Sequence, residues 1–126
     1  MPLVRIALRR GKSPAHLTAL RNGVYKAMRE TFNVPENDRF IVISQHDADE
    51  FEYDPNYLGI ARSDDLVIVQ ITCNSGRTVE QKKALYQGIA DNFSTDPGLR
   101  IEDVLINLVE VSKENWSFGN GIAQYA

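Results

Sequence analysis

Apolar residues in this chain form four short runs, with two longer stretches of helical spacing between them. Alternating or continuous apolar residues over four to eight positions predict β-strands. The third run is apolar at nearly every position, which is typical of a central strand covered on both faces. The four runs lie at residues 3–8, 40–43, 66–71 and 104–109.

The first helix is predicted to begin at Pro14 and to end at Asn33. Ser13 suits the N-cap position because its side-chain oxygen can accept a hydrogen bond from a backbone N–H of the first turn. Pro14 suits the first helical position because the N–H that proline lacks would have no partner within the helix there. Asn33 tolerates the left-handed conformation that ends helices, and Pro35 cannot continue one. The apolar side chains between these limits recur every three or four residues and predict one buried stripe: Leu17, Leu20, Val24, Met28 and Phe32.

The second helix is predicted to follow Thr78 and to end before Asp96-Pro97-Gly98. Thr78 and Gln81 have the spacing of a capping box, in which each side chain bonds the backbone of the other residue. The apolar stripe of this helix consists of Leu85, Ile89 and Phe93, together with Tyr86 and Ala90.

Residues 47–65 are acidic and have no regular period, so they predict a long loop. We expect its aromatic residues Phe51, Tyr53 and Tyr57 to hold it against the rest of the chain. The loop lacks the ligand spacing and the glycine of a calcium site, and no metal site is expected elsewhere.

Residues 2–46 and 66–111 show the same order of strand, turn, helix and strand. Each half therefore predicts a β-α-β unit with parallel strands, and right-handed crossovers place both helices on one face of a four-stranded sheet. The expected fold is a single α/β (α+β) domain over residues 1–126. Because apolar strands would leave the other sheet face bare, we also expect a homo-oligomer.

Composition narrows the possible partners. The chain has 126 residues, 14 Lys and Arg against 17 Asp and Glu, and a net charge of −3, so neither nucleic acid nor an acidic membrane is an expected partner. No apolar run is long enough for a signal peptide or a membrane span, which favours a cytoplasmic protein. The single cysteine, Cys73, can form neither an internal disulfide nor a zinc cluster, and His16 and His46 are expected to pack.

Pro2 is the most informative candidate for chemistry. Removal of the initiator methionine would leave a secondary amine at the start of the first strand. An apolar pocket and a neighbouring cation would both disfavour its ammonium form, which brings the pKa of the amine toward the range of a general base at neutral pH. Proline at the start of a strand is also an ordinary structural choice.

Arg77 lies in the turn before the second helix, directly after Gly76. Its guanidinium could bind a carboxylate with two parallel hydrogen bonds, assisted by the helix N-terminus, or it could be a solvated turn residue. Asp38, just before the second strand, is either a turn residue or the partner of an amine or a water. Trp116 and Phe118 follow the last strand and either complete the core or line a pocket.

The whole pattern resembles the tautomerase superfamily, and within it the malonate semialdehyde decarboxylase-like group. This resemblance implies two β-α-β units per subunit and a homotrimer. It rests on segments spread over nearly the whole chain, which are Pro2-Leu3, residues 32–40 (FNVPENDRF), Ser44-Gln45-His46, residues 59–63 (GIARS), Glu80-Gln81-Lys82 and residues 116–119 (WSFG).

Matched to the family residue by residue, Pro2 is the amino-terminal catalytic proline, Asp38 the catalytic aspartate and Arg77 the second of two active-site arginines. The first arginine is missing, and Ser75 or Asn74 stands in its place in a turn that is one residue longer. The resemblance implies that Arg77, Ser75, Trp116 and Phe118 form the substrate-binding set.

The expected function is a cofactor-independent tautomerase that acts on a small 2-keto or enol carboxylic acid. Arg77 would bind the carboxylate, and Pro2 would move the proton between oxygen and carbon. One alternative is a decarboxylase of a β-keto acid such as malonate semialdehyde, with the same site residues. A second alternative is a trimer that binds small acids without catalysis, which the missing arginine would favour.

Overall fold

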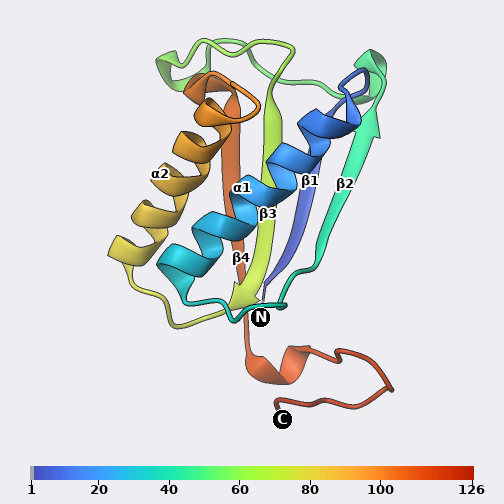
Figure 1. The fold of residues 1–126 in the computed structure, drawn as a ribbon, viewed down its shortest axis with the longest axis vertical. Coiled ribbons are helices and arrows are strands. Elements are labelled where there is room, and N and C mark those ends of the chain that lie inside the picture. The colour runs from blue at the N-terminus through green and yellow to red at the C-terminus, as the bar shows by residue number, and fades with distance from the viewer. Residues whose placement is uncertain (1) are drawn as a thin grey trace.

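A computed structural model describes residues 2–126 as a four-stranded sheet with both helices packed on one face (Figure 1). None of the helices in the described chain is both long and apolar enough to cross a membrane. The strands are β1 (Leu3–Arg9), β2 (Ile41–His46), β3 (Val67–Asn74) and β4 (Val104–Val111), and the helices are α1 (Pro14–Phe32) and α2 (Val79–Thr95).

The strands are ordered β2-β1-β3-β4. Parallel pairing of β1 with β2 and of β3 with β4 confirms the two β-α-β units, and the antiparallel pair β1–β3 joins them. Because of these directions, β1 and β2 begin at the same edge at which β3 and β4 end. We call it the Pro2 edge; it is the lower edge in Figure 1, next to the C-terminal segment.

Both helices begin as the sequence predicts. The Ser13 hydroxyl accepts a hydrogen bond from the His16 N–H at 3.2 Å, and Pro14 is the first residue of α1. Asn33 ends this helix in the left-handed conformation, with φ of 54°. At the start of α2, Thr78 and Gln81 form the reciprocal capping box. These satisfied backbone groups explain why the helix limits are readable from local sequence.

The core lies between the helices and the sheet. Four residues of the predicted α1 stripe are buried, while Leu17 is partly buried and packs against them. In α2, Leu85, Ile89 and Phe93 are buried, whereas Tyr86 is 36% exposed because its position turns it toward the rim of the helix layer.

The opposite face of the sheet is not covered within the chain. It carries exposed apolar side chains, including Val42, Leu105 and Val109. Polar side chains lie among them, and Gln70 donates a hydrogen bond to Asn107 on the neighbouring strand at 3.2 Å. β3 is therefore central, as predicted, but its second face is open and partly polar in the single chain.

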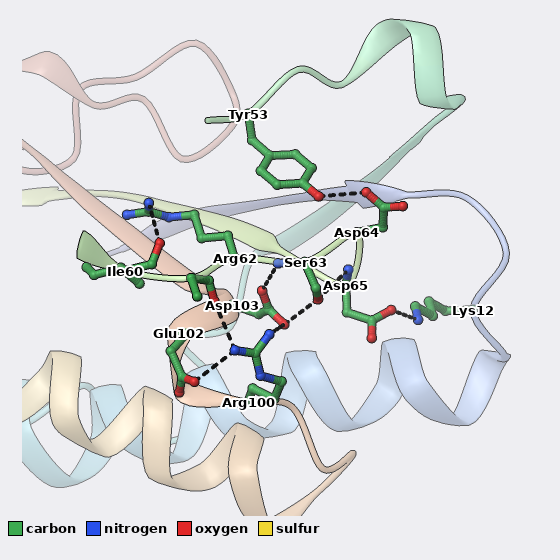
Figure 2. Close-up of polar contacts among 11 residues, drawn as sticks. Lys12, Tyr53, Ile60, Arg62, Ser63, Asp64, Asp65, Arg100, Glu102 and Asp103 are labelled. Atoms are coloured by element: carbon green, nitrogen blue, oxygen red, sulfur yellow. Dashed lines mark hydrogen bonds and ion pairs between the residues drawn. The ribbon is translucent and has the colours of Figure 1, made fainter. Parts of the chain in front are cut away.

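The loop between β2 and β3 is held mainly by a buried carboxylate (Figure 2). Asp103 is fully buried and accepts hydrogen bonds from the backbone N–H of Ser63 at 2.7 Å and from its hydroxyl at 2.6 Å. Arg100 adds a bond to the carbonyl of Ala61 at 2.9 Å. Asp103 as acceptor and Arg100 as donor thus replace the strand partners that this segment lacks.

The aromatic residues of this loop play a smaller part than expected. Phe51 is buried against the ring of His46, and the Tyr53 hydroxyl donates to Asp64 at 2.6 Å. The prediction for Tyr57 was wrong, because its side chain is 64% exposed. Leu58, next to it, has a positive φ of 60°, and Tyr57 lines a shallow pocket with Ile68 and Leu105 instead of packing into the core.

Candidate active site

A small apolar pocket opens at the Pro2 edge. Its volume is about 220 Å³, and we call it the aromatic pocket. The start of β1, the residue before β2 and the segment after β4 meet there because of the strand directions. The residues that line it are Pro2, Leu3, Phe40, Trp116, Ser117 and Phe118.

Pro2 is buried directly before β1. Two residues further on, the backbone N–H of Val4 donates to the carbonyl of Phe40 at 2.9 Å, so the hydrogen bonds between β1 and β2 begin beside the pocket. Phe40 was predicted within the second strand, but that strand begins at Ile41. The Phe40 side chain is 53% exposed and lines the pocket instead of the core.

Trp116 and Phe118 line the pocket and do not belong to the core, which decides between the two interpretations of these residues. Their rings stack with centroids 5.3 Å apart. Tyr125 packs edge-on against Phe118, with ring centroids 4.9 Å apart, a contact that was not predicted from the sequence. Gln124 bonds the backbone of both Phe118 and Gly119, which folds the C-terminal segment back on itself beside the pocket.

Arg77 is half-buried and held in one orientation by α1. Its Nη2 donates to the carbonyl of Phe32 at 3.2 Å, and its guanidinium carbon lies 4.8 Å from the centroid of the Phe32 ring. Its Nη1 donates to the main-chain oxygen of Asn74, also at 3.2 Å. The side chain is thus not a freely solvated turn residue.

Asn74 connects Arg77 to the aromatic pocket. While its main-chain oxygen accepts from Arg77, its side-chain Oδ1 accepts from the indole Nε1 of Trp116 at 2.7 Å. Asn74 is only 8% exposed. Ser75, the other residue considered in place of the first arginine, is exposed, and its backbone N–H donates to Val111 at 3.0 Å. Of the two, Asn74 makes the contact with a pocket residue.

Asp38 lies in the turn before β2 and is half-buried, with its backbone N–H donating to Pro35 at 3.2 Å. Burial raises the pKa of its carboxyl above the ordinary value, and the positive charge of Arg77 opposes this rise. The two side chains therefore act on one another electrostatically. Neither is among the six residues that line the aromatic pocket: Arg77 is connected to it through Asn74, and Asp38 lies two positions before Phe40 in the chain.

Two further groups support the turn that carries Arg77. Cys73 is buried at the end of β3, and burial raises the pKa of its thiol, as suits a packing role. Lys82 of α2 binds Glu110 of β4 at 2.6 Å, and this contact lowers the pKa of Glu110. The ion pair joins the start of α2 to the end of the sheet and was not predicted, because the two residues are distant in sequence.

A larger pocket of about 580 Å³ lies at the opposite edge of the sheet. Each of its cations already has a carboxylate partner: Arg9 with Asp64, Arg10 with Asp47, and Lys12 with Asp65. The cations of this pocket are therefore less available to an anionic ligand than Arg77 is. The exposed carboxylates of Asp47, Asp49 and Glu50 also lie there, and among the described residues they are the group close enough together to hold a metal ion.

Two β-α-β units in one mixed sheet, with a buried proline before the first strand and an aromatic pocket around it, define a tautomerase-like enzyme fold. A family model described as tautomerase enzyme matches residues 38–119, and a second model with the same description matches residues 2–60. The chain belongs to the tautomerase family.

Two curated relatives from Bacillus subtilis (strain 168) support this assignment over nearly the full length. The chain is 48% identical to the probable tautomerase YusQ over 124 residues, with 98% of each chain covered. It is 30% identical to the probable tautomerase YrdN over 125 residues, with 99% of this chain and 96% of the relative covered.

Solved structures agree with the fold. A malonate semialdehyde decarboxylase superimposes with a TM-score of 0.91 at 33% identity, covering 98% of this chain and 95% of that one. A second malonate semialdehyde decarboxylase, inhibited by 3-bromopropiolate, gives a TM-score of 0.91 at 32% identity, with 98% and 93% covered. A fused 4-OT symmetric trimer, at 24% identity and a TM-score of 0.79 over 98% and 97%, shares the fold.

Proposed function

We propose that this tautomerase-family enzyme interconverts the enol and keto forms of a small 2-keto carboxylic acid, with the amine of Pro2 as acid and base. The observation that supports this most is the burial of Pro2 in the aromatic pocket, next to Trp116, which Asn74 connects to Arg77. An amine in such apolar surroundings loses part of the solvation of its ammonium form and becomes a better base at neutral pH.

The proton transfer needs no group besides Pro2 and the substrate. The free amine takes the proton from the enol hydroxyl, and the electron pair of that O–H bond forms the keto carbonyl. The carbon–carbon double bond opens and takes a proton from the resulting ammonium. The proton has then moved from oxygen to carbon, and the amine is free again. Removal of Met1, whose structure lies outside the described residues, is a condition of this step.

Arg77 binds the substrate carboxylate in this proposal and stabilises the enolate. Its two hydrogen bonds to main-chain oxygens orient the guanidinium and leave other N–H groups for the ligand. A fixed donor at a developing oxyanion is worth about 3 kcal/mol. Asp38, which Arg77 influences electrostatically, would orient Pro2 or a water molecule. Trp116 and Phe118 keep water out, and Ser75 completes the binding set.

The test is an assay of the ketonisation of the enol form of phenylpyruvate, which is monitored by the loss of the enol's ultraviolet absorption. We expect the wild-type protein to accelerate the reaction and Pro2→Ala to reduce kcat/KM by about 10²–10⁴-fold, the usual contribution of a positioned acid or base. Alanine also permits removal of Met1, so the variant changes the amine and little else. Full activity of Pro2→Ala would refute the proposal.

Decarboxylation of a β-keto acid is the second candidate, because two malonate semialdehyde decarboxylases are above 30% identical over nearly the whole chain. Protonated Pro2 would then polarise the keto oxygen while Arg77 positions the carboxylate that leaves as carbon dioxide. Carbon dioxide release that depends on Pro2 would favour this reaction. Its absence, together with ketonisation, would favour tautomerisation.

We also propose that the protein is a homotrimer in which the open sheet face packs against other subunits. The exposed Val42, Leu105 and Val109 on that face support it, since a single chain has no further helix to cover them. The side chains of Gln70 and Asn107 already bond one another, which satisfies part of their hydrogen-bonding capacity at such an interface.

A further inference from the structure

The side-chain amide of Asn74 has a defined orientation. An indole N–H can only donate, so the Asn74 atom that lies 2.7 Å from Trp116 Nε1 must be the oxygen. The donor end of the same amide, Nδ2, is therefore turned away from the indole. The assignment follows from the chemistry of the partner and not from the shape of the amide, in which oxygen and nitrogen are nearly alike.

The donor end of this amide is unused by the chain. Within residues 2–126, Nδ2 of Asn74 forms no hydrogen bond, although 92% of the residue is buried. It is also not among the buried atoms of the described chain that lack a partner, so it reaches an opening. A nearly buried amide with an accessible donor is suited to a ligand that supplies an acceptor oxygen.

The place of Asn74 indicates which ligand that is. Its main-chain oxygen holds Arg77, and its side chain holds Trp116, which lines the pocket beside Pro2. Asn74 therefore contacts both Arg77 and a residue of the pocket, although it is not itself among the six residues that line the pocket. Because the amide is neutral, it can bind one carboxylate oxygen without adding a positive charge to that of Arg77.

We propose that Asn74 is a substrate-binding residue whose Nδ2 donates a hydrogen bond to the carboxylate of the bound 2-keto acid, with Trp116 fixing the amide in the required orientation. This inference rests on the substrate class proposed above, but not on the proton transfer by Pro2. One consequence concerns selectivity, since the free acid should depend on Asn74 more strongly than its neutral ester does.

Binding can be measured directly because Trp116 is the single tryptophan of the chain. The probes are pyruvate and methyl pyruvate, titrated against Trp116 fluorescence. Asn74→Asp keeps an oxygen for Trp116 but replaces the donor with a carboxylate oxygen. We expect the Kd of pyruvate to rise about tenfold or more, as for a lost bond to a charged group. The Kd of methyl pyruvate should change by less than about threefold, which corresponds to a small change in binding free energy.

Asn56→Asp is the matched control, because it makes the same substitution in the exposed loop far from the pocket and should leave both Kd values unchanged. Asn74→Ala, which removes the donor without adding a charge, separates the lost bond from repulsion between two carboxylates, and it also serves if Asn74→Asp fails to fold. Equal losses for both probes, unchanged binding of pyruvate, or no pyruvate binding by the wild type would each overturn the inference.

The failure of this inference can be told apart from failure of the proposed function. Ketonisation by the wild type with an unchanged KM in Asn74→Asp would overturn the role of Asn74 and leave the proposed function intact. Pyruvate binding that depends on Asn74, in a protein that does not catalyse ketonisation, would support the role of Asn74 and overturn the proposed function.

Discussion

The guanidinium of Arg77 lies over the ring of Phe32, with 4.8 Å between the guanidinium carbon and the ring centroid, and Nη2 donates to the carbonyl of the same residue. Phe32 is the last residue of α1 and is buried in the core. The position of the arginine is therefore set by the packing of the first β-α-β unit, although Arg77 itself belongs to the second.

Replacement of Arg77 by lysine should abolish most of its function despite the retained charge. An ammonium cannot bond two main-chain oxygens and a carboxylate in one plane, so we expect kcat/KM for ketonisation to fall about 10²-fold. The kcat/KM of Arg77→Gln should fall by at least the same factor. Steady-state kinetics on both variants tests this, and near wild-type activity of Arg77→Lys would contradict the role of the guanidinium fork.

Asp38→Asn should raise stability while lowering activity. Burial raises the pKa of Asp38 above its ordinary value of 3.8, so the folded state binds its proton more tightly than the unfolded state does. The charged carboxylate thus costs stability at neutral pH, and the cost disappears below about pH 3.8, where both states are protonated.

Thermal unfolding of the wild type and Asp38→Asn across this pH range measures the effect. We expect a higher unfolding midpoint for the variant at pH 7 and matching midpoints at pH 3.5. Asp49→Asn, at an exposed loop position, is the control for the loss of one negative charge. A less stable Asp38→Asn at pH 7 would show that the carboxylate stabilises the fold instead.

Asp103→Ala should destabilise the protein by about 1–3 kcal/mol, because it leaves the N–H of Ser63 without its buried acceptor. Ser63→Ala removes the hydroxyl that donates to Asp103 and accepts from the exposed backbone N–H of Asp65, and should cost about 1 kcal/mol. The control is Glu102→Ala, which breaks an exposed ion pair with Arg100 and should cost less than about 1 kcal/mol. Urea unfolding monitored by circular dichroism gives the order of the three costs, and a Glu102→Ala cost above that of Asp103→Ala would contradict it.

A charge on the open sheet face should disrupt assembly. Val109 is 38% exposed on β4, and burial of a lysine there against another subunit would be unfavourable. We expect a trimer for the wild type and smaller species for Val109→Lys in sedimentation velocity. Val79→Lys, which changes a valine that is 60% exposed at the start of α2, should remain trimeric. A monomeric wild-type protein would refute the assembly.

Elements with local signals were predictable from the sequence. Ser13 and Asn33 limit α1, and Thr78 with Gln81 begins α2, because capping depends on residues three or four positions apart. The resemblance of short segments to a known family pointed to Pro2, Asp38 and Arg77 together, which no period or spacing in this chain could do.

The relationships that remained unpredicted all join distant parts of the chain. The antiparallel pairing of β1 with β3 has no local signal, since the register depends on both units at once. The bond between Trp116 and Asn74 spans 42 positions, and Tyr125 reaches Phe118 only because the C-terminal segment folds back. Tyr57 showed the opposite failure, because an aromatic residue in a loop does not by itself determine whether it is buried.

The most direct test of the central claim is the intact mass of the purified native protein, measured on the same sample that is assayed for ketonisation. A free amine at Pro2 requires a chain without Met1, because an amide nitrogen is not a base. We expect the active sample to have the mass of residues 2–126. Full ketonisation activity in a sample that retains Met1 on every chain would contradict acid–base catalysis by Pro2.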